Sequence, residues 1–212
     1  VPSRNRYGII GPIYPQEMQP ETLQKKISES PLTKDKAGQK PSYCVVTNCT
    51  YDGVCYNAKE AQDLLEKTSD RLHFDEAWYG YARFNPIYAD HYAMRGEPGD
   101  HNGPTVFATH STHKLLNALS QASYIHVREG RGAINFSRFN QAYMMHATTS
   151  PLYAICASND VEVSMMDGNS GLSLTQELID EAVDFRQAMA RLYKEFTADG
   201  SWFFKPWNKE VV

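Results

Sequence analysis

A lysine at the end of an apolar segment is the residue with the clearest chemical potential. Val106–Ala108 predicts a short buried strand, and the polar run Ser111–Lys114 follows it. At the mouth of a pocket such a lysine can be desolvated, which lowers the pKa of its amine and makes it nucleophilic towards a carbonyl. The Ser111 hydroxyl and the His113 imidazole suit an anionic group such as a phosphate in the same pocket. For a lone lysine, however, an ordinary strand-to-helix turn is the more common explanation.

Lys114 is not alone. Ser111-Thr112-His113-Lys114 and the following Leu115–Ser123 resemble the pyridoxal-phosphate lysine signature of the bacterial ornithine/lysine/arginine decarboxylases. The resemblance covers essentially the whole chain and is nearest to the acid-inducible, arginine-specific members. It implies an α/β fold, the central part of an aspartate aminotransferase-like large domain that binds pyridoxal 5'-phosphate. It also implies that Lys114 holds this cofactor covalently and that Ser111 and His113 lie against its phosphate.

The run Asp75-Glu76-Ala77-Trp78 follows a predicted strand, Leu72–Phe74. Pyridoxal phosphate stabilises a carbanion best when its pyridine nitrogen is protonated, and a carboxylate in a low-dielectric site keeps that proton. The run resembles the family's Asp-x-Ala-aromatic element, which implies that Asp75 pairs with the pyridinium and Ala77 packs under the ring. Trp78 would donate its indole N–H near the phenolic oxygen. An isolated Asp75 would more often cap the next turn, and the role of Glu76, where lysine- and ornithine-specific relatives usually carry a small residue, stays open.

Two further segments resemble family elements less specifically. Thr50-Tyr51-Asp52-Gly53 resembles the turn on the substrate side of the ring, although a plain Asp-Gly turn explains it equally well. Ala147–Pro151 resembles the segment that reaches the phosphate of a neighbouring subunit, and only Thr148 is assigned this role. A Ser/Thr-rich helix entry before a proline would look the same.

The sequence leaves two other classes of protein open. A metal-binding module could use His110 and His113 with Asp75 or Asp90, but two histidines three residues apart are a weak metal signal. A non-catalytic assembly fragment is the other alternative, because the sequence lacks an upstream strand–glycine–helix unit that could cradle a phosphate. The chain starts at Val1 in mid-pattern, which suggests an internal piece of a longer protein.

The composition of the chain limits the class of protein to which it can belong. A chain of 212 residues with 42% hydrophobic and 22% charged residues is typical of a soluble globular protein. A net charge of −4 without a basic stripe gives no reason to expect nucleic acid, and no apolar run approaches the roughly 18 residues of a membrane helix. Four cysteines without C-x-x-C spacing predict buried free thiols in a reducing cytosol.

Alternating strands and helices predict a mostly parallel sheet with helices on both faces and a ligand site at the carboxyl ends of the strands. The predicted strands are Tyr43–Thr47, Leu72–Phe74, Thr105–Thr109 and Tyr124–Val127. The predicted helices are Pro20–Glu29, one capped by Asn57 that runs to Thr68, Phe136–His146, and Pro151–Met166.

The end of the chain predicts a long amphipathic helix. After a break at Asp167–Gly171, Ser173 and Gln176 form a capping box. The helix carries an apolar stripe interpreted as core packing: Leu174, Leu178, Ala182, Phe185, Met189, Leu192 and Phe196. Ser201–Phe204 then predicts the beginning of a strand. We therefore divide the chain into part of a cofactor-binding domain, residues 1–167, and the start of a C-terminal domain, residues 168–212.

The resemblance implies an enzyme that removes CO2 from a basic amino acid, most simply L-arginine to agmatine, in acid resistance. Lysine or ornithine remain alternatives, because no residue here can be assigned to the guanidinium group. It also implies a cytoplasmic homodimer that assembles into a larger ring, a decamer by resemblance. Expressed alone, the chain is expected to be inactive and either poorly soluble or oligomeric.

Overall fold

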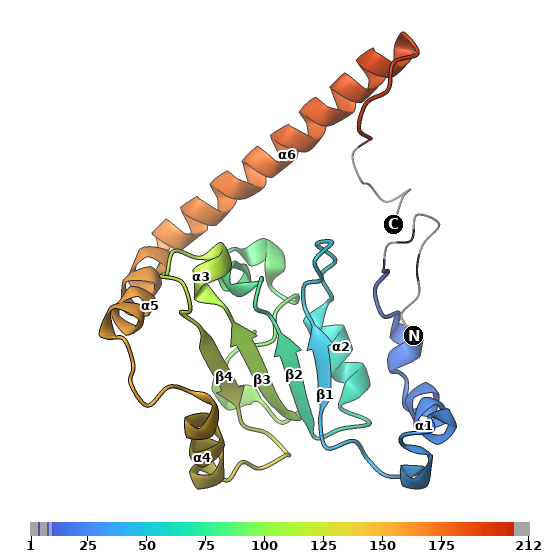
Figure 1. Ribbon diagram of the computed structural model, residues 1–212, viewed down its shortest axis with the longest axis vertical. Helices are drawn as coiled ribbons and strands as arrows, with labels where there is room; N and C mark the ends of the chain where they lie inside the picture. Colours follow the sequence, from blue (N-terminus) through green and yellow to red (C-terminus); the bar gives the residue numbers. More distant parts are fainter. Residues whose placement is uncertain (1–3, 5–7, 9, 206–212) are drawn as a thin grey trace.

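The structure, a computed structural model, describes residues 4, 8 and 10–205. These residues form a four-stranded sheet whose strands follow sequence order (Figure 1). The strands are β1 (Cys44–Thr47), β2 (Arg71–Asp75), β3 (Thr105–His110) and β4 (Tyr124–Arg128). β1 and β2 pair in parallel, as do β2 and β3, whereas β4 runs antiparallel to β3. The predicted α/β class with a mostly parallel sheet is confirmed.

The short connection after β3 explains why β4 reverses direction. The helix in this connection, α3 (Thr112–Leu115), has four residues and is therefore only about 6 Å long. The six residues of β3 extend over roughly 20 Å. A parallel return needs a crossover that carries the chain back along the whole strand, which α3 cannot do.

One face of the sheet is covered by α2 (Ala58–Leu65). The side chain of Asn57 accepts a hydrogen bond from Glu60 N, so the predicted cap is confirmed, although the helix ends at Leu65 and not at Thr68. The buried core combines this helix with the strand residues beneath it and with two connecting segments. Its members are Met18, Val46, Ala58, Ala61, Leu65, Leu72, Phe74, Ala93, Val106 and Ala108.

The opposite face is largely uncovered, and we call it the open face. Successive strand residues point to opposite sides, so Leu72 and Phe74 are fully buried while the residues between and after them are half-buried. On the open face Val45 is 52% exposed, and the ring of Phe107 stacks on Phe139 at 6.3 Å. The prediction of helices on both faces is met only in part: α4 (Phe136–His146) contacts this face through Phe139, and no layer comparable to α2 covers the rest of it among the described residues. The strand residues on the open face include Val45, Thr47, His73, Asp75, Phe107 and Thr109, and on β4 Ile125 and Val127.

The remaining helices mostly follow the predicted ranges. α1 (Pro20–Glu29) and α4 (Phe136–His146) have the expected bounds, and α5 (Tyr153–Met166) begins two residues after Pro151. Short 3-10 helices occupy the connections, at Pro15–Met18, Lys34–Lys36, Gly80–Phe84, Pro86–Tyr88 and Pro98–Asp100. Among the described helices, none combines the length and apolar character that crossing a membrane requires.

The last helix, α6 (Asn169–Ala198), begins earlier than predicted. The turn before it is only Asp167–Gly168, and Gly168 adopts φ 59°, which favours glycine. Gly171, in the first turn of α6, lies against the backbone of Met166. A side chain at this position would clash with that backbone. The capping box prediction is therefore wrong, because Ser173 lies within the helix.

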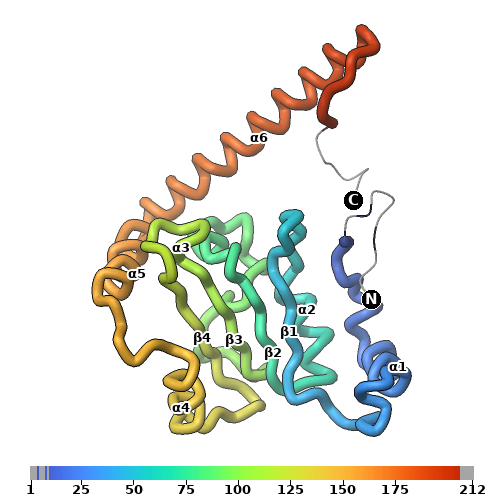
Figure 2. Tube along the Cα trace, in the orientation of Figure 1, coloured from blue at the N-terminus to red at the C-terminus, as the bar shows by residue number. Residues whose placement is uncertain are grey.

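α6 projects away from the sheet (Figures 1 and 2). Its apolar stripe is exposed, with Leu178 at 61% and Phe185 at 65%, so the prediction of core packing is wrong for this chain. The predicted strand at Ser201–Phe204 is also absent from the described residues. Instead the ring of Phe203 stacks on Phe196 at 5.0 Å. The division at residues 167 and 168 stays a prediction.

Candidate active site

Three segments meet at the carboxyl ends of β1, β2 and β3, the edge at which parallel strands of α/β sheets present ligand sites. They enclose a cavity of about 80 Å³. It is lined by Thr47, Cys49, Tyr51, Asp75, Ala77, Trp78 and Lys114. The structure thus brings together Asp75, Ala77, Trp78 and Lys114, which the sequence singled out across a separation of about forty residues.

Aromatic rings support the lysine. The Lys114 ammonium lies 5.5 Å from the centre of the Trp78 ring, within the range of a cation–π interaction. The Tyr51 ring meets Trp78 edge-on, with ring centres 5.5 Å apart. Lys114 itself is exposed, so the expectation of a desolvated amine is wrong for this chain. The reason is that α3 is a single turn at the rim of a face that the described residues leave uncovered.

Asp75 ends β2 and lines the cavity from the open face. Its Oδ1 accepts a hydrogen bond from Ala77 N at 3.3 Å, so the carboxylate also caps the next turn. A carboxylate has two oxygens with several acceptor positions, and the capping role therefore leaves capacity for a ligand proton. Both interpretations of Asp75 are compatible with this geometry.

Ser111 and His113 flank the lysine but do not line the cavity in the described part of the chain. Ser111 precedes α3, and its carbonyl accepts a hydrogen bond from Lys114 N at 3.1 Å. His113 Nδ1 lies 2.7 Å from the carbonyl oxygen of Ala122. A carbonyl can only accept, so Nδ1 carries the proton, and Nε2 of the neutral ring is left as an acceptor. Their predicted role at a phosphate stays a prediction.

The two weaker assignments differ in what the structure shows. Thr50–Gly53 forms the expected turn, in which Gly53 N donates to Thr50 O at 2.9 Å and Gly53 adopts φ 78°. Thr148 is exposed between α4 and α5, and its hydroxyl accepts a hydrogen bond from Ser150 N at 3.0 Å. Thr148 does not line this cavity, and its role towards a neighbouring subunit stays a prediction.

Behind the cavity lies a buried polar cluster centred on Glu76, which is 0% exposed. Glu76 Oε1 accepts hydrogen bonds from Asn48 Nδ2 at 2.9 Å and from Ala93 N at 2.8 Å. Its Oε2 contacts His110 Nε2 at 3.0 Å. Because His110 pairs with Glu76, it is not directed to a metal. The described residues contain no group of three or more His, Cys, Asp or Glu that could hold one.

Strand alternation separates the cavity from this cluster. Thr47 and Asp75 point to the open face, so the residue after each, Asn48 and Glu76, points to the covered face. Sequence reasoning placed Tyr51 in the turn on the substrate side of the ring but assigned no role to Asn48 or Cys49. The signal was their position directly after β1, equivalent to that of Asp75 at the end of β2.

Two groups near the site have displaced pKa values. A hydrogen bond from the Cys55 thiol lowers the pKa of Cys49 to about 7, outweighing burial and the charge of Glu76, which both act in the other direction. Burial, and secondly the proximity of His110, lowers the pKa of His126 to about 4. The rings of His110 and His126 lie 4.8 Å apart. The predicted buried free thiols are confirmed as free, but Cys55 and Cys156 are exposed.

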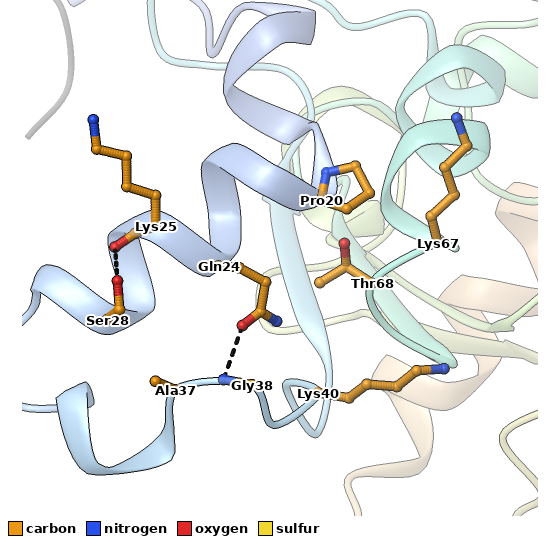
Figure 3. A pocket seen from close by; sticks show the side chains of 9 residues that line it. All are labelled: Pro20, Gln24, Lys25, Ser28, Ala37, Gly38, Lys40, Lys67 and Thr68. Atoms are coloured by element: carbon orange, nitrogen blue, oxygen red, sulfur yellow. Dashed lines mark hydrogen bonds between the residues drawn. The ribbon is translucent and has the colours of Figure 1, made fainter.

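A larger groove of about 620 Å³ lies away from this chemistry (Figure 3). It is bounded by α1, residues 37–40 and the end of α2, which lead into the amino ends of the strands. Its lysines stand around an open hollow, and Lys40 pairs with Asp70 at 3.5 Å. The groove therefore plays no part in the site at the opposite edge of the sheet.

Comparison with known proteins decides the family. The whole chain, residues 1–212, matches the family described as Orn/Lys/Arg decarboxylase, major domain. The chain belongs to this family. It is 99% identical over its full length to the biodegradative arginine decarboxylase of Escherichia coli (strain K12), and 48% identical to the lysine decarboxylase LdcA of Pseudomonas aeruginosa. It spans 28% of the length of each of these relatives.

Solved structures of the family confirm the fold. Lysine decarboxylase A from Pseudomonas aeruginosa is similar with a TM-score of 0.84 and 48% identity, covering 96% of this chain and 27% of that one. The Escherichia coli constitutive lysine decarboxylase is similar with a TM-score of 0.82 and 39% identity, covering 100% of this chain and 28% of that one.

Proposed function

We propose that the protein containing this chain is a pyridoxal-phosphate-dependent decarboxylase of a basic amino acid, converting L-arginine to agmatine and CO2 in acid resistance. The observation that carries this proposal is the convergence of Lys114, Asp75 and Trp78 on one cavity. The 99% identical relative is named an arginine decarboxylase, which favours arginine. Lysine and ornithine are the alternatives, because other relatives bear those names.

The residues present fit the cofactor by the chemistry of their side chains. Lys114 supplies a primary amine that would hold an aldehyde, and Asp75 supplies a carboxylate that would hold a proton on the ring nitrogen. Ala77 and Trp78 offer a small and an aromatic surface for the ring. The cavity of about 80 Å³ is much smaller than the roughly 300 Å³ of an ordinary small-molecule pocket, so this chain would form one wall of a larger site. When bound, pyridoxal phosphate supplies an electron sink for the carbanion left at the substrate Cα.

The chain's own residues would divide the remaining work. The negative charge of Asp75 favours a protonated ring nitrogen, which strengthens the sink. The Trp78 ring keeps the Lys114 ammonium at the cavity through the cation–π contact. His113 Nε2, once protonated, and the Ser111 hydroxyl could donate to a phosphate, while Thr148 would act at the site of a partner subunit.

Replacing Lys114 tests the central assignment. In the full-length protein, reduction with borohydride in the presence of the cofactor should label the peptide that contains Lys114, and Lys114→Ala should abolish the label. Lys25 lies in the distant groove, so Lys25→Ala is the matched control and should keep the label. Labelling of another lysine in the unaltered protein would show that the assignment is wrong.

Replacing Asp75 tests its partnership with the ring nitrogen. Asp75→Asn should keep the cofactor bound but lower kcat by at least about 100-fold, because removing one preorganised electrostatic contact costs this much. Asp35→Asn, which changes a carboxylate that is 66% exposed in the 3-10 helix Lys34–Lys36, is the control. Near-normal kcat in Asp75→Asn would refute the assignment. Comparing CO2 release from arginine, lysine and ornithine tests the substrate.

The proposal also includes the assembly and the location of the protein: a homodimer that assembles into a larger ring and acts in the cytoplasm. The exposed stripe on α6 supports association, since isolated apolar faces of this length favour burial. The free cysteines fit a reducing compartment. Residues 1–212 expressed alone should be inactive and oligomeric or poorly soluble. A soluble monomer that decarboxylates arginine would contradict this.

A further inference from the structure

Cys49 and Cys55 lie opposite one another across the turn that follows β1. Thr50 N donates to Val54 O at 3.0 Å, and Val54 N donates to Thr50 Oγ1 at 3.2 Å. This pairing places the two cysteines at facing positions one residue further from the turn, where side chains come close. The Cys55 thiol donates a hydrogen bond to the Gly53 carbonyl within the same turn at 3.7 Å, and its sulfur lies close enough to Cys49 to change the pKa of that thiol.

The surroundings give the two thiols different roles. Cys49 is half-buried, packs against the buried Tyr79 cluster and lines the same cavity as Lys114. Cys55 is exposed to solvent. The interaction with Cys55 that lowers the pKa of Cys49 to about 7 also raises the pKa of Cys55. Near neutral pH a substantial fraction of Cys49 is therefore the thiolate, the nucleophilic form, while Cys55 remains a protonated thiol.

We propose that Cys49 and Cys55 are a redox modification site, forming a reversible disulfide in response to hydrogen peroxide. The Cys49 thiolate attacks one oxygen of the peroxide, the O–O bond breaks, and hydroxide leaves and takes up a proton. The Cys55 sulfur then attacks the oxidised Cys49 sulfur and displaces its oxygen as water. Two thiols and one peroxide thus give one disulfide and two waters. A dithiol reductant reverses the change.

The disulfide would act on the site through the turn it closes. Tyr51 lies within the closed loop and meets Trp78 edge-on at 5.5 Å. Bridging Cys49 and Cys55 removes the Cys49 thiol from the cavity wall and fixes the turn that carries Tyr51. Oxidation should therefore lower activity. This consequence rests on the proposed function, whereas the disulfide itself does not.

Mass spectrometry of the full-length protein tests the disulfide. The protein is treated with a small excess of peroxide, alkylated and cleaved before Asp52, which separates Cys49 from Cys55. A cross-linked pair of peptides, lost after treatment with dithiothreitol, is the expected result. Cys156 is the control, because it is exposed and should remain alkylated. Cys49 and Cys55 both fully alkylated after peroxide would overturn the proposal.

Cys44 lies on the same peptide as Cys49 and needs its own control. It begins β1, and the strand places it more than about 10 Å from the turn, too far for a disulfide. Burial also raises its thiol pKa. Cys44→Ser should therefore keep the cross-link and Cys55→Ser should lose it. The reverse pattern would overturn the assignment.

Activity tests the consequence. Peroxide should lower the decarboxylase activity of the full-length protein at least about tenfold, because small displacements at a site cost this much, and dithiothreitol should restore it. Cys55→Ser should be active before treatment, and peroxide should lower its activity less than twofold. Full activity in a protein shown to be cross-linked would overturn control of the site. If the unoxidised protein has no decarboxylase activity at all, the proposed function fails, and the cross-link still decides the redox inference.

Discussion

The buried carboxylate of Glu76 offers a sharp test of how the site is supported. In Glu76→Ala the backbone N–H of Ala93 and the ring N–H of His110 lose their acceptor, and Asn48 keeps only its bond to the His91 carbonyl. Each buried donor left without a partner costs about 1–3 kcal/mol. Two such donors, with the packing lost around them, give about 3–5 kcal/mol, which is also the usual cost of breaking a buried ion pair.

This cost should fall on the ends of β2 and β3. Hydrogen exchange followed by mass spectrometry on the full-length protein measures the local opening free energy there. A loss of about 3–5 kcal/mol corresponds to a decrease in protection of roughly two to three and a half orders of magnitude, since about 1.4 kcal/mol is tenfold. The peptides to follow contain Arg71–Trp78 and Thr105–Lys114.

The matched control is Glu29→Ala. Glu29 is 64% exposed and pairs with Lys25 at 3.8 Å, so its removal should cost less than about 0.5 kcal/mol. Glu76→Gln should fall between the two, because its amide keeps one acceptor for Ala93 and presents N–H groups towards His110. If Glu76→Ala and Glu29→Ala change protection by the same small factor, the idea that this cluster supports Asp75 and Ala77 is refuted.

Three further predictions follow from single sites. The pKa of His126 is lowered to about 4, so the fold, which holds this ring neutral, is most stable above pH 6.5 and loses stability as the pH falls from 6.5 towards 4. In His126→Gln the thermal-denaturation midpoint should therefore change less with pH across that range. Gly130→Ala should lower the denaturation midpoint by an amount equivalent to about 1–3 kcal/mol, because the added Cβ would lie 2.7 Å from the Pro104 backbone, whereas Gly99→Ala meets open space and should not. Asn57→Ala should cost about 1 kcal/mol through loss of its cap on Glu60 N, seen as faster hydrogen exchange in α2.

Much of the site could be predicted because its residues lie in short continuous stretches of the sequence. Lys114 and Asp75 each follow an apolar segment directly, and the rule that ligands bind at strand carboxyl ends places both at one edge. The strand and helix ranges follow from local periodicity, and the cap at Asn57 from local side-chain chemistry. These features depend on residues close in sequence, so the sequence by itself determined them.

Other features depend on contacts between distant residues. The partners of Glu76 come from three separate segments, near Asn48, Ala93 and His110, and no local pattern relates them. The first turns of α6 also have a distant partner: the buried Thr175 accepts a hydrogen bond from Asn85 Nδ2 at 3.4 Å, and a capping signature at Ser173 cannot reveal it.

The exposure of individual groups was decided by tertiary structure alone. A periodic apolar stripe shows that a helix has an apolar face, but whether that face is covered depends on what lies beside it. Leu178 and Phe185 are exposed because α6 leaves the sheet, and Lys114 is exposed because nothing described here covers the open face above α3.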